Sequence, residues 1–394
     1  MLTKIYTWIV LLFVPLTIYK INILTFTLAD ALLILAMPFL LIDMLMIKKR
    51  ANINIHILIV TFGIFAHMLI LVFFNHSEFQ NDTLMRTLRY ISYLLFIAVF
   101  AREYFNVRLG LKLLRIISVL SSVYLIIQFI LLNYFNYYLS GFLPGLPLSS
   151  ESLDEIIRRY SLGYSKRPTS IFQEPAHFSS YVLLYFGILL FDDTKKQKNE
   201  LILIGIAIIL SGSSTGILLA IGLLLLWTVR SLKNLNNLNK ILNYVILIAF
   251  IGFCFLLFTK TQIFNSFIER TFENRTATTG RLGNYKDVFY AYDISLVQQI
   301  IGHGMLKYDE YIPSIPRIYF YFGGSGLLLF CLYSLRYLII KKGYKRISLI
   351  ILLVSTLGTE IAFGSFMLLY LPFIIDLNSN KDKFEKIPDL LLQN

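Results

Sequence analysis

Long runs of apolar residues recur along the whole chain, separated by short polar stretches. Many of these runs contain roughly 18 or more residues, which lets an α-helix cross a hydrocarbon core about 30 Å thick. A breaker cluster, Ser211-Gly212-Ser213-Ser214, separates two of the shorter runs. The pattern predicts about twelve transmembrane helices, with eleven or ten as alternatives, at residues 5–20, 23–47, 53–74, 84–101, 113–139, 177–191, 201–210, 215–229, 241–259, 317–340, 347–358 and 361–375.

The composition supports a membrane protein. Hydrophobic residues make up 57% of the chain and charged residues only 15%, whereas a soluble domain has roughly 45–50% and about 25%. Both cysteines, Cys254 and Cys331, lie within apolar runs, so we interpret them as small core residues and not as a disulfide framework. We therefore expect an all-α, polytopic protein with a single transmembrane domain at 1–376 and a short cytoplasmic tail at 377–394.

The basic residues predict the orientation of these helices. They cluster in alternate short loops, at 48–50, 102–115, 195–198, 230–240 and 341–346, while the turns at 75–83, 211–214 and 359–360 hold no lysine or arginine. Cytoplasmic loops carry such an excess of basic residues. Both termini are therefore expected in the cytoplasm, and the net charge of +13 reflects membrane topology, with no nucleic acid as partner.

Two longer loops, at about 140–176 and 260–316, are expected on the extracytoplasmic side. The first ends with Arg167, Glu174 and His177 within eleven positions, directly before and at the start of an apolar run. An arginine, a carboxylate and an imidazole could together bind a phosphate and accept a proton. The alternative is that Glu174 only caps a helix, which Pro175 would begin, and that Arg167 only anchors the chain at the interface.

The second long loop carries Arg270, Arg275 and Arg281, the last directly after Gly280. Because a guanidinium group is planar and always charged, it suits phosphate oxygens. Several such groups could stabilise a departing pyrophosphate without a metal. Contacts with lipid headgroups are the alternative for Arg270 and Arg275.

Further candidates lie in or near apolar runs. His303 stands between two glycines, where either a plain turn or a proton shuttle is possible. Arg86 and Arg89 are three positions apart, so they share a helix face and could both point at an anionic lipid-linked substrate or extend to the interface. Glu360 lies between the last two runs, and a charge in the membrane suggests a function. Asp30 and the more central His67 are expected to be paired core residues.

Several motifs are missing from the sequence. There is no Walker A loop, no Asp-x-Asp pair in the predicted outer loops, and no group of histidines with metal-ligand spacing. Any chemistry is therefore expected to need neither a metal nor another cofactor.

Together these elements resemble the O-antigen polymerase and ligase superfamily of bacteria. The resemblance rests on RPTSIF at 167–172, Glu174-Pro175, SGSSTG at 211–216, Thr279-Gly280-Arg281 and IGHG at 301–304. Ligases often carry an arginine where this chain has Ser214, which favours the polymerase branch. The resemblance implies an enzyme of the bacterial cytoplasmic membrane that transfers a growing glycan, O-antigen or capsule, from undecaprenyl pyrophosphate to a lipid-linked repeat unit at the outer face. Membrane lipids, a flippase and a chain-length regulator would be its other partners.

On this interpretation Glu174 is the general base, with His177 or His303 as alternatives. Arg167 and Arg281 would hold the pyrophosphate, and the remaining candidates would bind substrate: Arg86, Arg89, Arg270, Arg275 and Glu360. An O-antigen ligase is the nearest alternative. A transporter or flippase of the lipid-linked oligosaccharide is another, but it would be expected to show internal repeats and charges near the bilayer midplane. A membrane scaffold without chemistry is the third.

Overall fold

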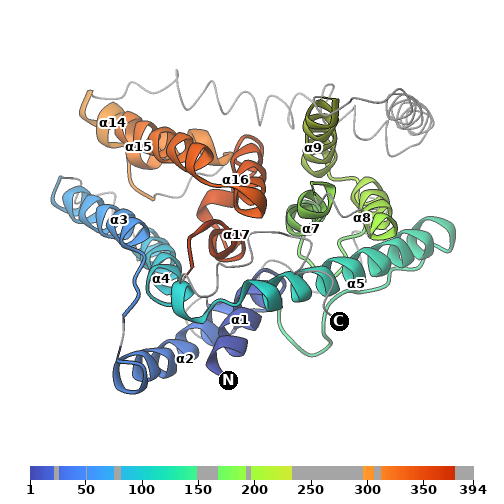
Figure 1. Cartoon of the computed structure of the whole chain (residues 1–394), viewed down its shortest axis with the longest axis horizontal. Helices are drawn as coiled ribbons and strands as arrows, with labels where there is room; N and C mark the ends of the chain where they lie inside the picture. The colour runs from blue at the N-terminus through green and yellow to red at the C-terminus, as the bar shows by residue number, and fades with distance from the viewer. Residues whose placement is uncertain are drawn as a thin grey trace.

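The computed structural model describes residues 1–21, 26–49, 51–74, 81–148, 167–191, 197–232, 296–305 and 312–377. These residues are helical and contain no strand, only isolated bridges such as the one between Tyr19 and Leu148. Figure 1 shows the helices α1 (Leu2–Leu16), α2 (Leu28–Ile42) with its extension η1 (Asp43–Ile47), α3 (Ile55–Phe74), α4 (Asn81–Tyr104), α5 (Val107–Tyr134), α7 (Pro175–Leu190), α8 (Lys198–Leu210), α9 (Ser214–Leu232), α14 (Leu296–Ile301), α15 (Ser314–Ile340), α16 (Gly343–Thr356), η4 (Ile361–Phe363) and α17 (Phe366–Ile374).

The protein is all-helical, as predicted, and its helices suit a membrane. Among the described residues, four helices are long and apolar enough to span a bilayer, and shorter apolar helices accompany them. The four are Leu28–Ile47, Thr83–Tyr104, Val107–Tyr134 and Ser314–Ile340. A count of twelve is compatible with this arrangement. The predicted helix at 241–259, and all of the second long loop except its final part, lie outside the described residues.

Most helix boundaries agree with the sequence pattern, but α5 begins six residues before its predicted start at 113. Asn106 caps this helix, since its side chain accepts a hydrogen bond from the backbone N–H of Leu109 at 3.1 Å. Arg108, Lys112 and Arg115 therefore lie on the first turns of α5 and not in a loop. The error arose because charged residues on the first turns of a helix resemble a loop in a hydropathy pattern.

The centre of the bundle is formed by α7 and α17. Every residue of α7 from Phe178 to Leu190 is buried. α17 lies between α1, α4, α7 and α16 (Figure 1). Buried tyrosine hydroxyls join these helices: Tyr370 donates to the Ser180 carbonyl at 2.6 Å, and Tyr181 donates to the Leu11 carbonyl at 2.9 Å. Each hydroxyl thus has a partner in an apolar core, as its burial requires.

The outer helices expose large apolar side chains. Examples are Leu35 and Phe39 on α2, Phe62 on α3, and Leu328 and Ile339 on α15. A soluble protein rarely leaves so many apolar groups in water. Their exposure is expected where lipid surrounds the helices.

α15 is interrupted at Gly323, whose φ of +63° a residue with a side chain rarely adopts. The carbonyls of Phe320 and Tyr321 instead accept hydrogen bonds from the backbone N–H groups of His303 and Gly304, at 2.8 and 2.9 Å. Gly302 and Gly323 allow the close approach, because a Cβ on Gly302 would lie 2.5 Å from the Gly323 nitrogen. The segment that bears His303 is therefore fixed to the broken helix.

Ion pairs fasten one end of the bundle, where α4 and α15 end and α8 begins. Lys48 pairs with Glu103 at 3.0 Å, and Arg115 pairs with Glu200 at 2.6 Å. Asp376 pairs with Lys341 at 2.5 Å and also with Lys345. Burial would raise the pKa of Asp376, but the hydrogen bonds and charges of the two lysines outweigh it and lower this pKa. We call this end the lysine end.

The contact between α7 and α9 depends on Gly216. A Cβ at Gly216 would lie 2.4 Å from the Cβ of Ser179, whereas a Cβ at Gly222 on the same helix would meet nothing within 4 Å. We expect Gly216→Ala to lower the free energy of unfolding by about 1–3 kcal/mol through overpacking. Gly222→Ala is the matched control and should stabilise α9 by up to about 1 kcal/mol. Thermal unfolding in one detergent measures both, and equal destabilisation by the two variants would contradict the packing.

Candidate functional site

Helix interruptions meet at the opposite end of the bundle, which we call the break end. They are residues 211–213 between α8 and α9, residues 357–365 around η4, and residues 167–174, which lead into α7. A Cβ on Gly212 would lie 3.0 Å from the Arg167 side chain, and one on Gly358 would lie 3.1 Å from Thr215. Arg167 thus lies against the interruption at 211–213. The start of α9, directly after that interruption, lies against the interruption at 357–365.

α5 holds the segment that leads into α7. Ser170 has a φ of +57° and donates its N–H to the Gln128 side chain at 2.7 Å. Its hydroxyl donates to the Ser121 carbonyl, also at 2.7 Å. Gly141 allows this path, because a Cβ there would lie 1.8 Å from the Ser170 carbonyl oxygen. The strained residue is therefore fixed from several sides, which sets where Arg167 and Glu174 lie.

α7 begins at Pro175, two residues before the predicted run at 177–191, and Pro175 lies in its first turn as expected. Glu174 is its N-cap residue, but the Glu174 side chain makes no capping hydrogen bond and is exposed. Farther along, the Ser179 hydroxyl bonds the Pro175 carbonyl at 3.0 Å and lies 3.2 Å from the Ser211 hydroxyl. These contacts join the start of α7 to the first interruption and leave the Glu174 carboxylate at the surface of the break end.

An arginine–glutamate pair occupies the middle of the break end. Arg317 Nη1 lies 2.6 Å from Glu360 Oε2, and Nη2 lies 2.6 Å from Oε1, so the pair is bidentate. The Arg317 guanidinium also lies over the Tyr321 ring, 5.9 Å from its centroid. The Tyr321 hydroxyl also interacts with the Arg86 guanidinium. α4, α15 and the residue before η4 thus each contribute a charged or polar group here.

His177 connects this pair to the start of α7. Its imidazole interacts electrostatically with the carboxylates of both Glu174 and Glu360. The ring also packs against Phe366 of α17, at 5.7 Å between centroids. We use the name polar cluster for the residues that these contacts bring together, which are Arg86, Glu174, His177, Arg317, Tyr321 and Glu360.

Backbone contacts hold Arg317 and Glu360 in register. The Thr359 carbonyl accepts hydrogen bonds from both the N–H and the hydroxyl of Ser314, at 2.9 and 2.6 Å. The Ser314 hydroxyl in turn accepts the N–H of Ala362 at 3.1 Å, and the Ala362 carbonyl accepts the Tyr90 hydroxyl at 2.8 Å. The start of α15, the interruption at η4 and α4 therefore form one unit beneath the ion pair.

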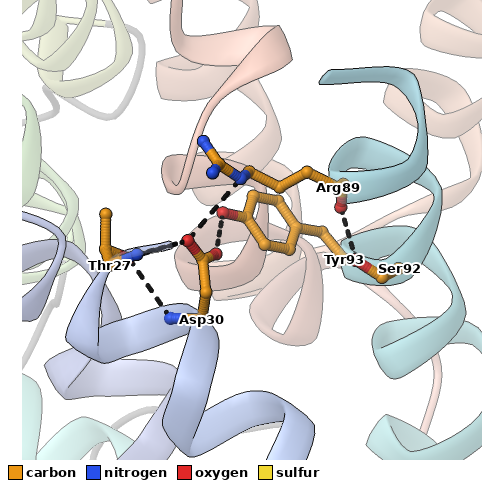
Figure 2. A network of polar contacts seen from close by, with 5 residues as sticks. All are labelled: Thr27, Asp30, Arg89, Ser92 and Tyr93. Atoms are coloured by element: carbon orange, nitrogen blue, oxygen red, sulfur yellow. Dashed lines mark hydrogen bonds and ion pairs between the residues drawn. The ribbon is translucent and has the colours of Figure 1, made fainter. Parts of the chain in front are cut away.

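A second polar network fastens α2 to α4 (Figure 2). Asp30 is only 3% exposed, and its carboxylate accepts the Tyr93 hydroxyl at 2.6 Å and lies 3.5 Å from Arg89 Nε. The same carboxylate forms a capping box with Thr27. This confirms Asp30 as a paired core residue, and it places Arg89 beside Asp30 while Arg86, three positions earlier, reaches Tyr321.

The remaining sequence candidates lie elsewhere. His303 stacks on Phe320, next to Tyr321, at 4.9 Å between ring centroids. His67 is paired, as expected, since its Nε2 lies 2.7 Å from the Ile301 carbonyl oxygen, but the residue is only half-buried and does not lie in the core. Arg270, Arg275 and Arg281 lie outside the described residues.

Arg317 and Tyr321 were not among the site residues predicted from the sequence. Arg317 stood at the first position of a predicted apolar run, where an arginine is usually an interface anchor. Its four-residue spacing to Tyr321 places both side chains on one face of α15, and that was the available signal. Its contact with Glu360, across 43 positions of sequence, has no signature in a single sequence.

The polar cluster has the groups for two tasks: guanidinium groups that bind anionic oxygens, and carboxylate or imidazole groups that accept a proton. Among the described residues, no group of three or more histidines, cysteines, aspartates and glutamates could hold a metal ion. No family model matches the chain, and no curated protein matches it significantly. The functional assignment therefore rests on the residues and their geometry.

Asp30 offers a test of the second network. We expect Asp30→Ala to lower the free energy of unfolding by about 2 kcal/mol or more, because it removes the partner of Arg89, the bond to Tyr93 and the capping box at once. Tyr93→Phe removes only one hydrogen bond and should cost about 1 kcal/mol. Thermal unfolding of both variants in detergent measures the difference. An Asp30→Ala protein as stable as the wild type would show that the network does not hold α2 to α4.

Proposed function

We propose that this protein is a polysaccharide polymerase of the bacterial cytoplasmic membrane. It would transfer a growing glycan from undecaprenyl pyrophosphate to a lipid-linked repeat unit at the outer face. The observation that carries the proposal is the polar cluster: arginines, carboxylates and a histidine from α4, α7, α15 and the η4 interruption meet at one end of an apolar helical bundle. The sequence resemblance to O-antigen polymerases supplies the substrate class.

The distribution of basic residues supports an outward-facing break end. The interruptions at 211–214 and 359–360 carry no lysine or arginine, while Lys48, Arg115 and Lys341 lie at the lysine end. Under the positive-inside rule the lysine end is cytoplasmic. The arginines of α4 and α15 at the break end contact carboxylates or a tyrosine. We propose the full topology of about twelve helices with both termini in the cytoplasm on this basis.

The reaction needs a base for the acceptor hydroxyl and cations for the departing pyrophosphate. Glu174 suits the first role because its carboxylate is exposed at the break end, where an acceptor hydroxyl could reach it. Arg167 and Arg281 are proposed for the second role, together with the arginines of the polar cluster. The surrounding apolar helices would let the prenyl chain of the donor stay in the bilayer while its pyrophosphate reaches the break end.

A ligase would use the same donor and the same groups, so it remains the nearest alternative. A flippase would need charged groups along a path through the midplane. The ion pairs of the described residues instead gather near the two ends of the bundle. This arrangement favours a transferase over a transporter.

The direct test is reaction of the purified protein with a defined undecaprenyl pyrophosphate-linked repeat unit in the presence of EDTA. We expect a ladder of lipid-linked products without added nucleotide. Glu174→Gln should slow the ladder at least about a hundredfold, as loss of a general base does. Asp376→Asn removes a carboxylate at the lysine end and is the matched control, which should keep wild-type turnover if it folds equally well.

A deletion strain separates the alternatives. Single repeat units displayed on the outer face indicate a lost polymerase and support the proposal. Single repeats trapped inside would indicate a lost flippase, and long chains left on the undecaprenyl carrier would indicate a lost ligase. Either of these last two outcomes would contradict polymerisation.

A further inference from the structure

The ion pair between Arg317 and Glu360 has the geometry of an arginine bound to an anionic ligand. Both terminal guanidinium nitrogens lie 2.6 Å from a carboxylate oxygen. The same fork binds two oxygens of a phosphate, because carboxylate and phosphate present similarly spaced acceptors. Glu360 therefore occupies the position on Arg317 that an anionic group of a substrate would take.

The two partners differ in how freely they can move. The Arg317 side chain is 14% exposed and lies against the Tyr321 ring, whereas the Glu360 side chain is 41% exposed. Glu360 stands between α16 and η4, outside regular helix. A ligand that approaches from the surface of the break end would therefore meet the carboxylate first and displace it, while the guanidinium stayed in place.

A displaced Glu360 carboxylate already has another polar neighbour. The His177 imidazole interacts electrostatically with Glu360 as well as with Glu174. Movement toward His177 would keep the carboxylate near an imidazole, whose ring N–H can donate a hydrogen bond. A hydrogen-bond donor within the polar cluster could thus partly replace the lost Arg317 contact.

A second guanidinium lies near the vacated position. Arg86 interacts with the Tyr321 hydroxyl, and Arg317 lies over the ring of the same tyrosine. With both carboxylates present, the charges of Arg86, Arg317, Glu174 and Glu360 sum to zero. Once Glu360 has turned away, the two guanidinium groups beside Tyr321 carry two positive charges, which match the two negative charges of a pyrophosphate diester.

We propose that Glu360 is a displaceable placeholder on Arg317, and that the pyrophosphate of a lipid-linked substrate replaces it there. The pyrophosphate as ligand rests on the proposed function. The inference adds Arg317 as the residue that binds this group and Glu360 as the residue that competes with it. A purely structural ion pair would instead stay closed when the ligand binds.

The experiment measures binding of farnesyl pyrophosphate and of inorganic pyrophosphate to the full-length protein in detergent micelles. Glu360→Gln removes the competing charge and should tighten binding about tenfold. Arg317→Lys keeps the charge but loses the fork, and it should weaken binding at least about tenfold. If the ion pair is purely structural, both variants should weaken binding. Affinity changes in opposite directions are therefore the signature of a placeholder.

The pair Arg115–Glu200 at the lysine end supplies matched controls, since it is also a close ion pair, at 2.6 Å. Arg115→Lys and Glu200→Gln should leave both affinities unchanged. Thermal unfolding without ligand shows which variants are folded. Should Arg317→Lys fail to fold, the tightening by Glu360→Gln alone decides the question.

Tighter binding of farnesyl pyrophosphate than of inorganic pyrophosphate identifies a lipid-linked ligand, and equal affinities identify the free diphosphate. The placeholder is supported in either case if the variants show opposite signs. No binding to the wild type, or unchanged affinity in Glu360→Gln, overturns it. If the two variants change the affinity in the expected directions but the transfer assay gives no ladder, the anion site is supported and the polymerase is rejected. If the assay gives a ladder but Glu360→Gln binds with unchanged affinity, the polymerase is supported and the placeholder is rejected.

Discussion

The hydrogen-bonding demand of the backbone governs how this bundle is built. The hydrocarbon core of a bilayer contains no water that could bind an exposed N–H or C=O group. A helix can therefore be interrupted there only where other protein groups replace the lost backbone hydrogen bonds. At Gly323 the replacement comes from the backbone of residues 303 and 304. At the η4 interruption it comes from Ser314, and at the α8–α9 interruption from serine hydroxyls. Interruptions therefore have to lie against other segments, and here several of them meet at one end.

This arrangement creates the polar cluster. A continuous helix directs its side chains outward at regular spacing, whereas residues at an interruption can turn toward neighbouring elements. Glu174 and Glu360 both stand beside such interruptions, and each lies near His177. Arg317 reaches the cluster from the first turn of α15, which the Ser314–Thr359 contacts hold in place. The hydrogen bonds that satisfy the backbone at the interruptions thus also position the charged side chains of the polar cluster.

Local features were readable from the sequence, and long-range pairings were not. Pro175 marked the start of α7 and Ser211-Gly212-Ser213 marked an interruption, because both act through the nearby backbone. The spacing of Arg86 and Arg89 predicted a shared helix face and a common target, but the two side chains reach different elements. Their different partners were not predicted, since those depend on α2 packing beside Arg89 and α15 packing beside Arg86. Arg317 was overlooked for the same reason: its partner lies far away in sequence.

The proposed function requires the break end to face outward, and cysteine labelling tests this orientation directly. In a background with Cys254 and Cys331 replaced by alanine, single cysteines at Glu174 and Lys342 place one exposed thiol at each end of the bundle. A membrane-impermeant maleimide applied to spheroplasts should label position 174 at once and position 342 only after permeabilisation. Labelling of position 342 in intact spheroplasts, with position 174 protected, would contradict the account.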